Sequence, residues 1–113
     1  MIKSKSKQSS QNHRASWQDY NISRERYIEL KQAAQSGKYQ DIVKEAAYIA
    51  NKDIAEYIIL SVMESRTYEK VEYVEGLGRI PYGRTDFYGY RRLFYHLLDE
   101  ELKRKADNRE YSS

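Results

Sequence analysis

The chain has 113 residues and a mass of 13.5 kDa, which is enough for one domain with a modest core. It has no cysteine, so disulfides and thiolate metal sites are excluded, as fits a reducing cytoplasm. The 20 basic and 17 acidic side chains leave a net charge of only +3, so charge supports nucleic-acid binding only where cations are gathered locally.

The first 16 residues, MIKSKSKQSSQNHRAS, contain four cations and no acidic residue. Such a segment buries too little apolar surface to offset the entropy of ordering it, so a disordered basic tail is predicted over residues 1–20. The segment lacks the apolar centre of a secretory signal. No apolar run in the chain approaches the roughly 20 residues that span a bilayer. The expected location is therefore cytoplasmic, without membrane contact.

From Asn21 onward apolar residues recur at helical spacing, which predicts a helical domain over residues 21–106. Ser23 is positioned to cap a first helix, RERYIELKQAAQS, which ends at Gly37. A second helix covers about Tyr39–Ala50. A third, DIAEYIILSVMES, has the most apolar stripe and is expected to form the centre of the core. The residues of that stripe are Ile54, Ala55, Ile58, Ile59 and Val62.

Thr67 is expected to cap a short helix, YEKVEYV, after which EGLGRIPYG, with three glycines and a proline, is predicted to be a loop. KVEYVE alternates in polarity, but it is too short to predict a strand. The last helix begins at Arg84 or Thr85 and runs to about Lys105, and a frayed end is expected over residues 107–113. The predicted fold is all-α, a small bundle of four to five helices.

The last predicted helix has an apolar side and a polar side. The apolar side is expected to pack against the third helix. By three- and four-residue steps, this side consists of Phe87, Tyr90, Phe94, Leu97, Leu98 and Leu102. The polar side carries Thr85, Asp86, Tyr88, Gly89, Arg92, Tyr95 and His96, with Arg91 at the boundary. This polar side is interpreted either as a solvated surface or as a surface that binds nucleic acid.

Three features of the polar side favour contact with a phosphate backbone. Arg84 and Thr85 lie in the first turn, where free N–H groups and the helix dipole attract phosphate. Gly89 costs about 1 kcal/mol relative to alanine in mid-helix, which a close approach of another backbone would justify. Arg91 and Arg92 place two cations beside tyrosines, a combination that binds phosphates and stacks on bases.

The order of short helix, turn and long helix is that of a helix-turn-helix, predicted at about residues 54–105. In that arrangement Tyr68 and Lys70, with Glu69, lie over the phosphates. The residues expected to face the groove are Arg84, Thr85, Asp86, Tyr88 and Arg92. Asp86 could accept a hydrogen bond from a cytosine amino group, or it could serve only as a first-turn acid that complements the helix dipole.

The stretch SRTYEKVEYV...GRTDFYGYRRLFYHLLDEEL resembles the C-terminal helix-turn-helix of small phage regulators of the ArpU and RinA type, which are similar to region 4 of sigma factors. The shared elements are TYEKV, the GRT turn, the aromatic pair FY, the basic pair RR and a leucine-rich end, within residues 54–102. The stretch also looks like the ends of Gram-positive prophage proteins that read GRxxFYxxRRxFFxLL. The resemblance implies a DNA-binding phage or prophage transcription regulator in a bacterial cytoplasm.

The chain departs from this pattern between the two helices. Sigma-type motifs have a short turn there, whereas this chain adds EYVEGLGRIPY. Arg79 in the added residues is expected to make a further phosphate contact, unless the longer connection widens the angle and spoils the fit to the groove.

The main alternative to DNA is a protein partner. A tyrosine-rich phage protein with arginines on its last helix could bind host RNA polymerase, the packaging machinery or a defence complex, because tyrosine and arginine are common interface anchors. A near-neutral domain with one helix-turn-helix should bind DNA weakly, so a homodimer or help from the tail is expected. Removing residues 1–16 should then weaken binding uniformly across sequences, unless the tail only aids solubility.

Catalysis and cofactor binding are not expected. No serine has a plausible histidine partner for nucleophilic catalysis, and GLGRIPYG lacks the Lys-Ser/Thr ending of a phosphate-binding loop. His13 and His96 lie far apart and neither has a metal-like spacing to carboxylates, so no metal site is predicted.

Overall fold

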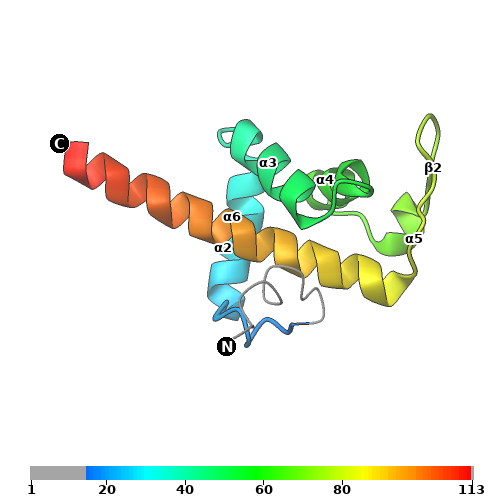
Figure 1. Cartoon of the computed structure of the whole chain (residues 1–113), viewed down its shortest axis with the longest axis horizontal. Coiled ribbons are helices and arrows are strands. Elements are labelled where there is room, and N and C mark those ends of the chain that lie inside the picture. Colours follow the sequence, from blue (N-terminus) through cyan, green and yellow to red (C-terminus); the bar gives the residue numbers. More distant parts are fainter. Residues whose placement is uncertain (1–14, 113) are drawn as a thin grey trace, which may run out of the picture.

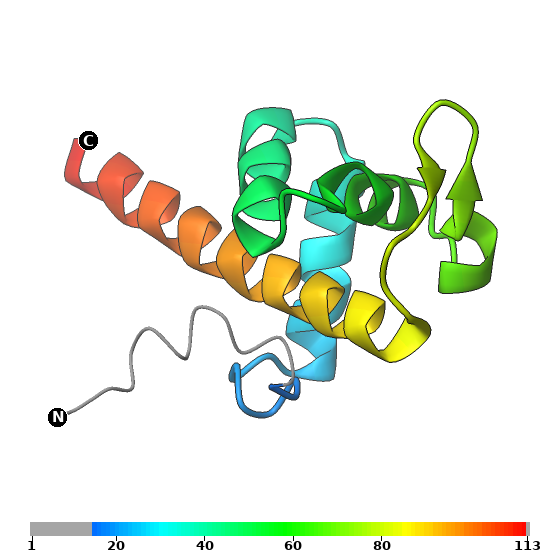
Figure 2. The ribbon, with the colours of Figure 1, turned by 45° about the vertical axis from the view of Figure 1, so that its right-hand side comes forward.

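The computed structural model describes residues 15–112 and confirms the all-α prediction: helices dominate, with one small hairpin (Figure 1). The elements in chain order are α2 (Arg24–Gln35), α3 (Gln40–Ala50), α4 (Ala55–Met63), α5 (Tyr68–Val71), β1 (Tyr73–Val74), β2 (Gly78–Arg79) and α6 (Arg84–Ser112). Helix α6 crosses the whole molecule. The hairpin lies at one end of the molecule, and the last turns of α6 project at the other (Figure 2).

The first three helices form where the spacing of apolar residues predicts them. Ser23 caps α2 with its side-chain oxygen, which accepts a hydrogen bond from the N–H of Arg26 at 3.1 Å. Gly37 follows the end of α2 with a φ of +84°, a left-handed conformation that glycine adopts without strain. In α4, Ile58 and Val62 are fully buried, so this helix belongs to the centre of the core, as predicted.

The predicted division of α6 into an apolar and a polar side is wrong at several positions. Tyr95, assigned to the polar side, is only 1% exposed, and Gly89 is buried as well. Leu93, which the spacing did not select, is also buried. The reason is that α6 packs against other parts of the chain on more than one side, so that a single apolar stripe does not describe its burial. Tyr90 and Leu97, assigned to the apolar side, are half-buried and pack against the core, as predicted.

The segment over residues 15–20, predicted to belong to the disordered tail, packs on the core instead. The ring of Trp17 lies 5.0 Å from that of Tyr27 and 5.8 Å from that of Tyr95, measured between centroids. Tyr20 stacks on His96 at 4.5 Å. The aromatic side chains supply the apolar burial that the preceding residues lack. The rest of the predicted tail, residues 1–14, lies outside the described residues.

A local hydrogen-bonding motif fixes the turn in this segment. The N–H of Ser16 donates to the Asp19 carboxylate at 3.0 Å, and the N–H of Asp19 donates to the Ser16 hydroxyl at 3.1 Å. This reciprocal pattern is that of a capping box, with aspartate in place of the usual glutamate. Burial raises the pKa of Tyr20, while the charge of Arg92 opposes that rise and the charge of Asp19 adds to it.

The connection between α5 and α6, predicted as a loop, contains an antiparallel hairpin in which Tyr73 pairs with Arg79 and Val74 with Gly78. Gly76 and Gly78 have φ values of +92° and +90°, which permit the tight reversal. The predicted short helix YEKVEYV therefore stops at Val71, because the following residues enter β1.

Hydrogen bonds to α4 hold the hairpin in place. The hydroxyl of Tyr57, in α4, lies 3.1 Å from the carbonyl oxygen of Leu77 and 2.8 Å from that of Gly78, and donates to these oxygens. A buried tyrosine thus anchors the hairpin. Its strands have only two residues each, and such a hairpin would be only marginally stable on its own.

Two further differences concern α6. The helix continues to Ser112 and does not end near Lys105, so the backbone over residues 107–112, predicted to be frayed, is helical. In addition, α5 has only four residues, and the hairpin separates it from α6. The two helices predicted to form the helix-turn-helix are therefore not joined by the short turn that the motif normally has.

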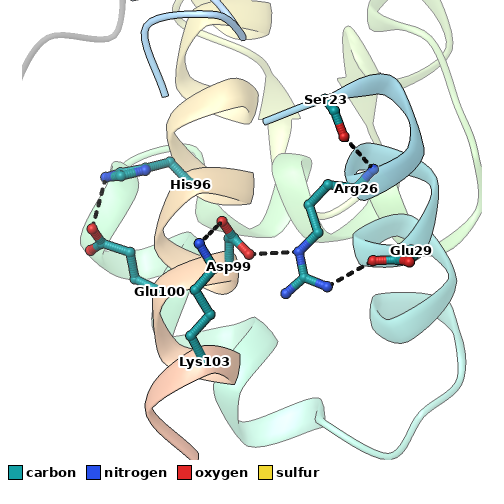
Figure 3. A network of polar contacts seen from close by, with 7 residues as sticks. All are labelled: Ser23, Arg26, Glu29, His96, Asp99, Glu100 and Lys103. Atoms are coloured by element: carbon teal, nitrogen blue, oxygen red, sulfur yellow. Dashed lines mark hydrogen bonds and ion pairs between the residues drawn. The ribbon is translucent and has the colours of Figure 1, made fainter. Parts of the chain in front are cut away.

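A polar network joins α2 to α6 (Figure 3). The Asp99 carboxylate, almost fully buried in α6, accepts a hydrogen bond from Nε of Arg26 at 2.7 Å and lies 3.3 Å from Nζ of Lys103. Arg26 also donates to Glu29 at 2.9 Å. Burial opposes the charge of Arg26, but the bonds to Glu29 and Asp99 outweigh that effect and raise its pKa. The buried carboxylate is thus matched by two cations.

Candidate nucleic-acid interface

Most of the predicted DNA-binding residues lie at one end of the molecule, which we call the hairpin end: residues 64–67, α5, the hairpin and the first turns of α6 (Figure 2). Lys70, Arg79, Arg84 and Thr85 are exposed there. They come from three separate elements, so it is the packing of α5 and the hairpin beside α6 that places them at the same end of the fold.

Glutamates accompany the exposed arginines of the hairpin end. Arg84 lies 3.2 Å from the carboxylate of Glu69, and Arg79 lies 3.3 Å from that of Glu72. Both pairs are well exposed, and such pairs contribute about 0–1 kcal/mol each. A phosphate group could therefore displace either glutamate at small cost.

The two predicted tyrosines of the hairpin end are used to join α5 to α6. The hydroxyl of Tyr88 accepts a hydrogen bond from the N–H of Tyr68 at 2.8 Å, and the hydroxyl of Tyr68 donates to the carbonyl oxygen of Tyr82 at 2.9 Å. Both side chains are half-buried, so their phenolic oxygens fix the start of α6 relative to α5. Asp86 is also half-buried, in the first turn of α6.

The two arginines of the predicted pair, Arg91 and Arg92, contact different parts of the chain. Nε of Arg92 donates to the carbonyl oxygen of Ala15 at 3.0 Å, so this side chain holds the N-terminal segment against α6. Nη1 of Arg91 donates to the hydroxyl of Ser61 at 2.9 Å, and its guanidinium lies 4.7 Å from the centroid of the Tyr88 ring. The structure thus does not bring the two cations to one site.

Arg91 borders a cleft of about 180 Å³, which we call the Arg91 cleft. The residues that line it are Tyr27, Lys31, Ser61, Val62, Ser65, Arg66, Thr67, Tyr88, Arg91 and Tyr95. Three of them are cations and none is a carboxylate. A second hollow shares three of these residues and is lined by Ser65, Arg66, Thr67 and Lys70, so it leads from the Arg91 cleft to α5.

Sequence reasoning missed Lys31, Ser65 and Arg66 as candidate site residues. Lys31 lies in the middle of α2 and has no local signal, because only tertiary packing brings it beside α6. Arg66 could have been selected from the sequence. It directly precedes the predicted cap at Thr67, so its cation lies close to the start of a helix.

The part of the chain that the structure describes contains neither a membrane-spanning helix nor a metal-binding cluster. No helix there has the length and apolar character needed to cross a bilayer. Among the same residues, no group of three or more histidine, aspartate or glutamate side chains could hold a metal ion.

Comparison with protein-family models, with curated proteins and with solved structures finds no match to this chain.

Proposed function

We propose that this chain is a non-enzymatic DNA-binding protein whose hairpin end contacts the phosphates of a duplex. The observation that carries the proposal is the gathering of Lys70, Arg79, Arg84 and Thr85, all exposed, from three elements onto one end of the molecule. The finer proposal, a phage or prophage transcription regulator, rests on the resemblance of its C-terminal half to ArpU- and RinA-type regulators.

The electrostatics of the hairpin end support backbone contact more than base reading. The glutamates that pair with Arg79 and Arg84 are exposed and weakly bound, so that both guanidinium groups can exchange a carboxylate for a phosphate. The first turn of α6 adds free N–H groups and the positive end of the helix dipole. These contacts carry little sequence information, so modest selectivity is expected.

The test is fluorescence anisotropy of the full chain on mixed duplex DNA at about 50 and about 200 mM salt. Neutralisation of three phosphates by Lys70, Arg79 and Arg84 should by itself lower the affinity by at least roughly fortyfold between these concentrations, because the log–log slope is about −0.9 for each phosphate neutralised. No binding at the lower salt concentration would overturn the proposal.

A matched pair of double variants locates the interface. Lys70→Gln with Arg84→Gln should make the slope shallower by about 1.8, the value for two lost phosphate contacts. Lys44→Gln with Lys105→Gln removes the same charge from exposed positions on α3 and in the second half of α6, away from the hairpin end, and should leave the slope unchanged. Equal effects of the two pairs would show that net charge, and not this surface, governs binding.

A protein partner, such as host RNA polymerase, is the second candidate, and one observation favours it. The hairpin exposes two large apolar side chains, Tyr73 at 62% and Leu77 at 48%. Exposed apolar groups at a projecting turn suit a protein interface. Binding through them would depend weakly on salt and would be lost on Leu77→Asp, whereas DNA binding through the cations predicts a steep salt dependence and a small effect of that substitution.

A further inference from the structure

We infer that the Arg91 cleft is a binding site for a single phosphate group. The inference rests on the proposed function for the source of that phosphate, the backbone of bound DNA. The charges and hydrogen bonds of the cleft itself support the site independently of that source. Its cations come from α2, from the turn between α4 and α5, and from α6, so the site exists only in the folded chain.

The charge of the cleft is positive and only partly compensated. Arg66 lies 2.7 Å from the carboxylate of Glu64, which offsets one cation. Lys31 and Arg91 have no carboxylate within ion-pair distance in the part of the chain that the structure describes. A half-buried guanidinium without an anion is an unusual arrangement, since buried charges are normally paired.

The hollow between α3 and α6 provides a contrast within the same molecule. It is lined by Glu45, Glu100 and Glu101 with Arg104, so carboxylates outnumber the cation. The Arg91 cleft, with three cations and no carboxylate in its lining, has the opposite character. Its positive charge therefore does not reflect a general excess of cations on this chain.

The Arg91 side chain is held in position before any ligand arrives. The Ser61 hydroxyl donates to the carbonyl oxygen of Arg66 at 2.5 Å and accepts from Nη1 of Arg91 at 2.9 Å, while the Tyr88 ring supports the guanidinium from one side. A guanidinium has five N–H donors, so one bond to Ser61 leaves donors available to an oxyanion. This fixed orientation reduces the entropy lost on binding.

The turn that forms the mouth of the cleft is also well fixed. Ser65 has a φ of +53°, and the next N–H, that of Arg66, donates to the carbonyl oxygen of Ser61 at 2.8 Å, which closes α4 in a Schellman-like turn. Gln35 of α2 donates to the Ser65 hydroxyl at 2.9 Å. Thr67 precedes α5 but makes no capping hydrogen bond with its side chain, so its hydroxyl is available at the mouth.

The size of the cleft fits a small anion. Its volume of about 180 Å³ is below the roughly 300–1,000 Å³ of pockets that enclose drug-sized ligands. The second hollow continues from Arg66 to Lys70, a residue of the hairpin end. A nucleic-acid backbone could thus place one phosphate in the cleft and neighbouring phosphates along α5.

The first arm of the test uses duplex DNA and the variant Lys31→Gln in the full chain. Lys31 makes no ion pair or side-chain hydrogen bond in the described part of the chain, so the substitution should not disturb folding. The salt slope should become shallower by up to about 0.9, the value for the loss of one phosphate contact. The control Lys44→Gln, at an exposed position of α3, should keep the wild-type slope.

The second arm titrates inorganic phosphate into the full chain and follows backbone amide resonances by NMR. Shifts at Ser65, Arg66 and Thr67 that saturate, and that Lys31→Gln abolishes, are expected. Saturable shifts without any DNA binding would keep the phosphate site and overturn the proposed function. DNA binding with an unchanged slope in Lys31→Gln, and no saturable shift, would overturn the phosphate site while DNA binding stands.

Discussion

Tyr95 shows at the scale of a single residue how α6 differs from a simple amphipathic helix. Its ring is enclosed by aromatic neighbours, with Trp17, Tyr27 and Phe94 all within 5.8 Å between ring centroids. Burial raises the pKa of its hydroxyl well above the ordinary value, and the nearby Tyr27 contributes to the rise. The phenolate form is therefore strongly disfavoured in the folded chain.

This raised pKa predicts that the protein loses stability in alkali. Above pH about 10 the unfolded chain releases the Tyr95 proton while the folded chain keeps it, so the folded state binds more protons and the free energy of unfolding falls as pH rises. Below that pH the contribution is fully present. Urea unfolding at about pH 8 and about pH 11 should show the loss.

The variant Tyr95→Phe keeps the ring and removes the titrating group, so its stability should fall less between the two pH values. Burial also raises the pKa of other tyrosines, namely Tyr20, Tyr68 and Tyr90, so part of the alkaline loss should remain in the variant. An identical fall in both proteins would contradict the assignment of this effect to Tyr95.

At the scale of elements, the segment over residues 15–20 is as much a part of the fold as the helices. It has no regular secondary structure, yet Trp17 packs against both Tyr27 and Tyr95, and Ala15 is buried. We expect Trp17→Ala to lower the free energy of unfolding by about 2 kcal/mol, less than the 3–5 kcal/mol of a fully buried tryptophan, because Trp17 is half-buried.

Urea denaturation of the variant and of a control, Tyr73→Ala, would measure this effect. Tyr73 is 62% exposed on the hairpin, so its truncation should change stability by less than about 0.5 kcal/mol. Equal losses in the two variants would indicate that the N-terminal segment does not stabilise the domain.

The sequence predicted those elements whose signals are local and repeated. Helices α2, α3 and α4 have two or more turns of apolar spacing, and α2 also has a capping serine and a terminal glycine. The hairpin has strands of two residues, too short for alternation to be informative, and its stability comes from the distant Tyr57. The docking of Trp17 likewise depends on rings far along the chain.

The candidate site was predictable only in part, for the same physical reason. Arg84 and Thr85 follow from their position at the start of a helix and Lys70 from the predicted helix-turn-helix, and the structure leaves all three exposed. The Arg91 cleft brings together Lys31 and Arg91, which are sixty positions apart, and no pattern in a single sequence records that proximity. Arg92 was predicted to face the DNA groove together with Arg84 and Thr85, but it bonds to Ala15, in a segment expected to be disordered.

At the scale of the whole molecule, charge is divided between the N-terminal residues and the folded domain. The cations Lys3, Lys5, Lys7 and Arg14 alone exceed the net charge of +3, so residues 15–113 are slightly acidic overall. DNA binding by such a domain depends on local cations and should gain from the basic residues before it.

We therefore expect removal of residues 1–14 to weaken DNA affinity equally for all sequences, with the salt slope shallower by up to about 3.6, and to leave thermal stability unchanged. Removal of residues 1–20 should lower thermal stability as well, because it also deletes Trp17 and Tyr20. Anisotropy and thermal denaturation of both truncated chains would measure these effects. Unchanged affinity at low salt after the shorter deletion would show that the basic residues do not contact DNA.

The contacts between the two ends of the domain determine when it can fold during synthesis. Ala15 meets Arg92 across 77 positions, and Arg26 meets Asp99 across 73. A ribosome releases the N-terminal segment and α2 first, and Ala15 and Arg26 lack these two partners until α6 has emerged as far as Asp99. Because such long-range contacts must close large loops, folding is completed only after the last helix has been made. A chain interrupted before Asp99 would leave the apolar faces of α2 and α4 open to chaperones and proteases.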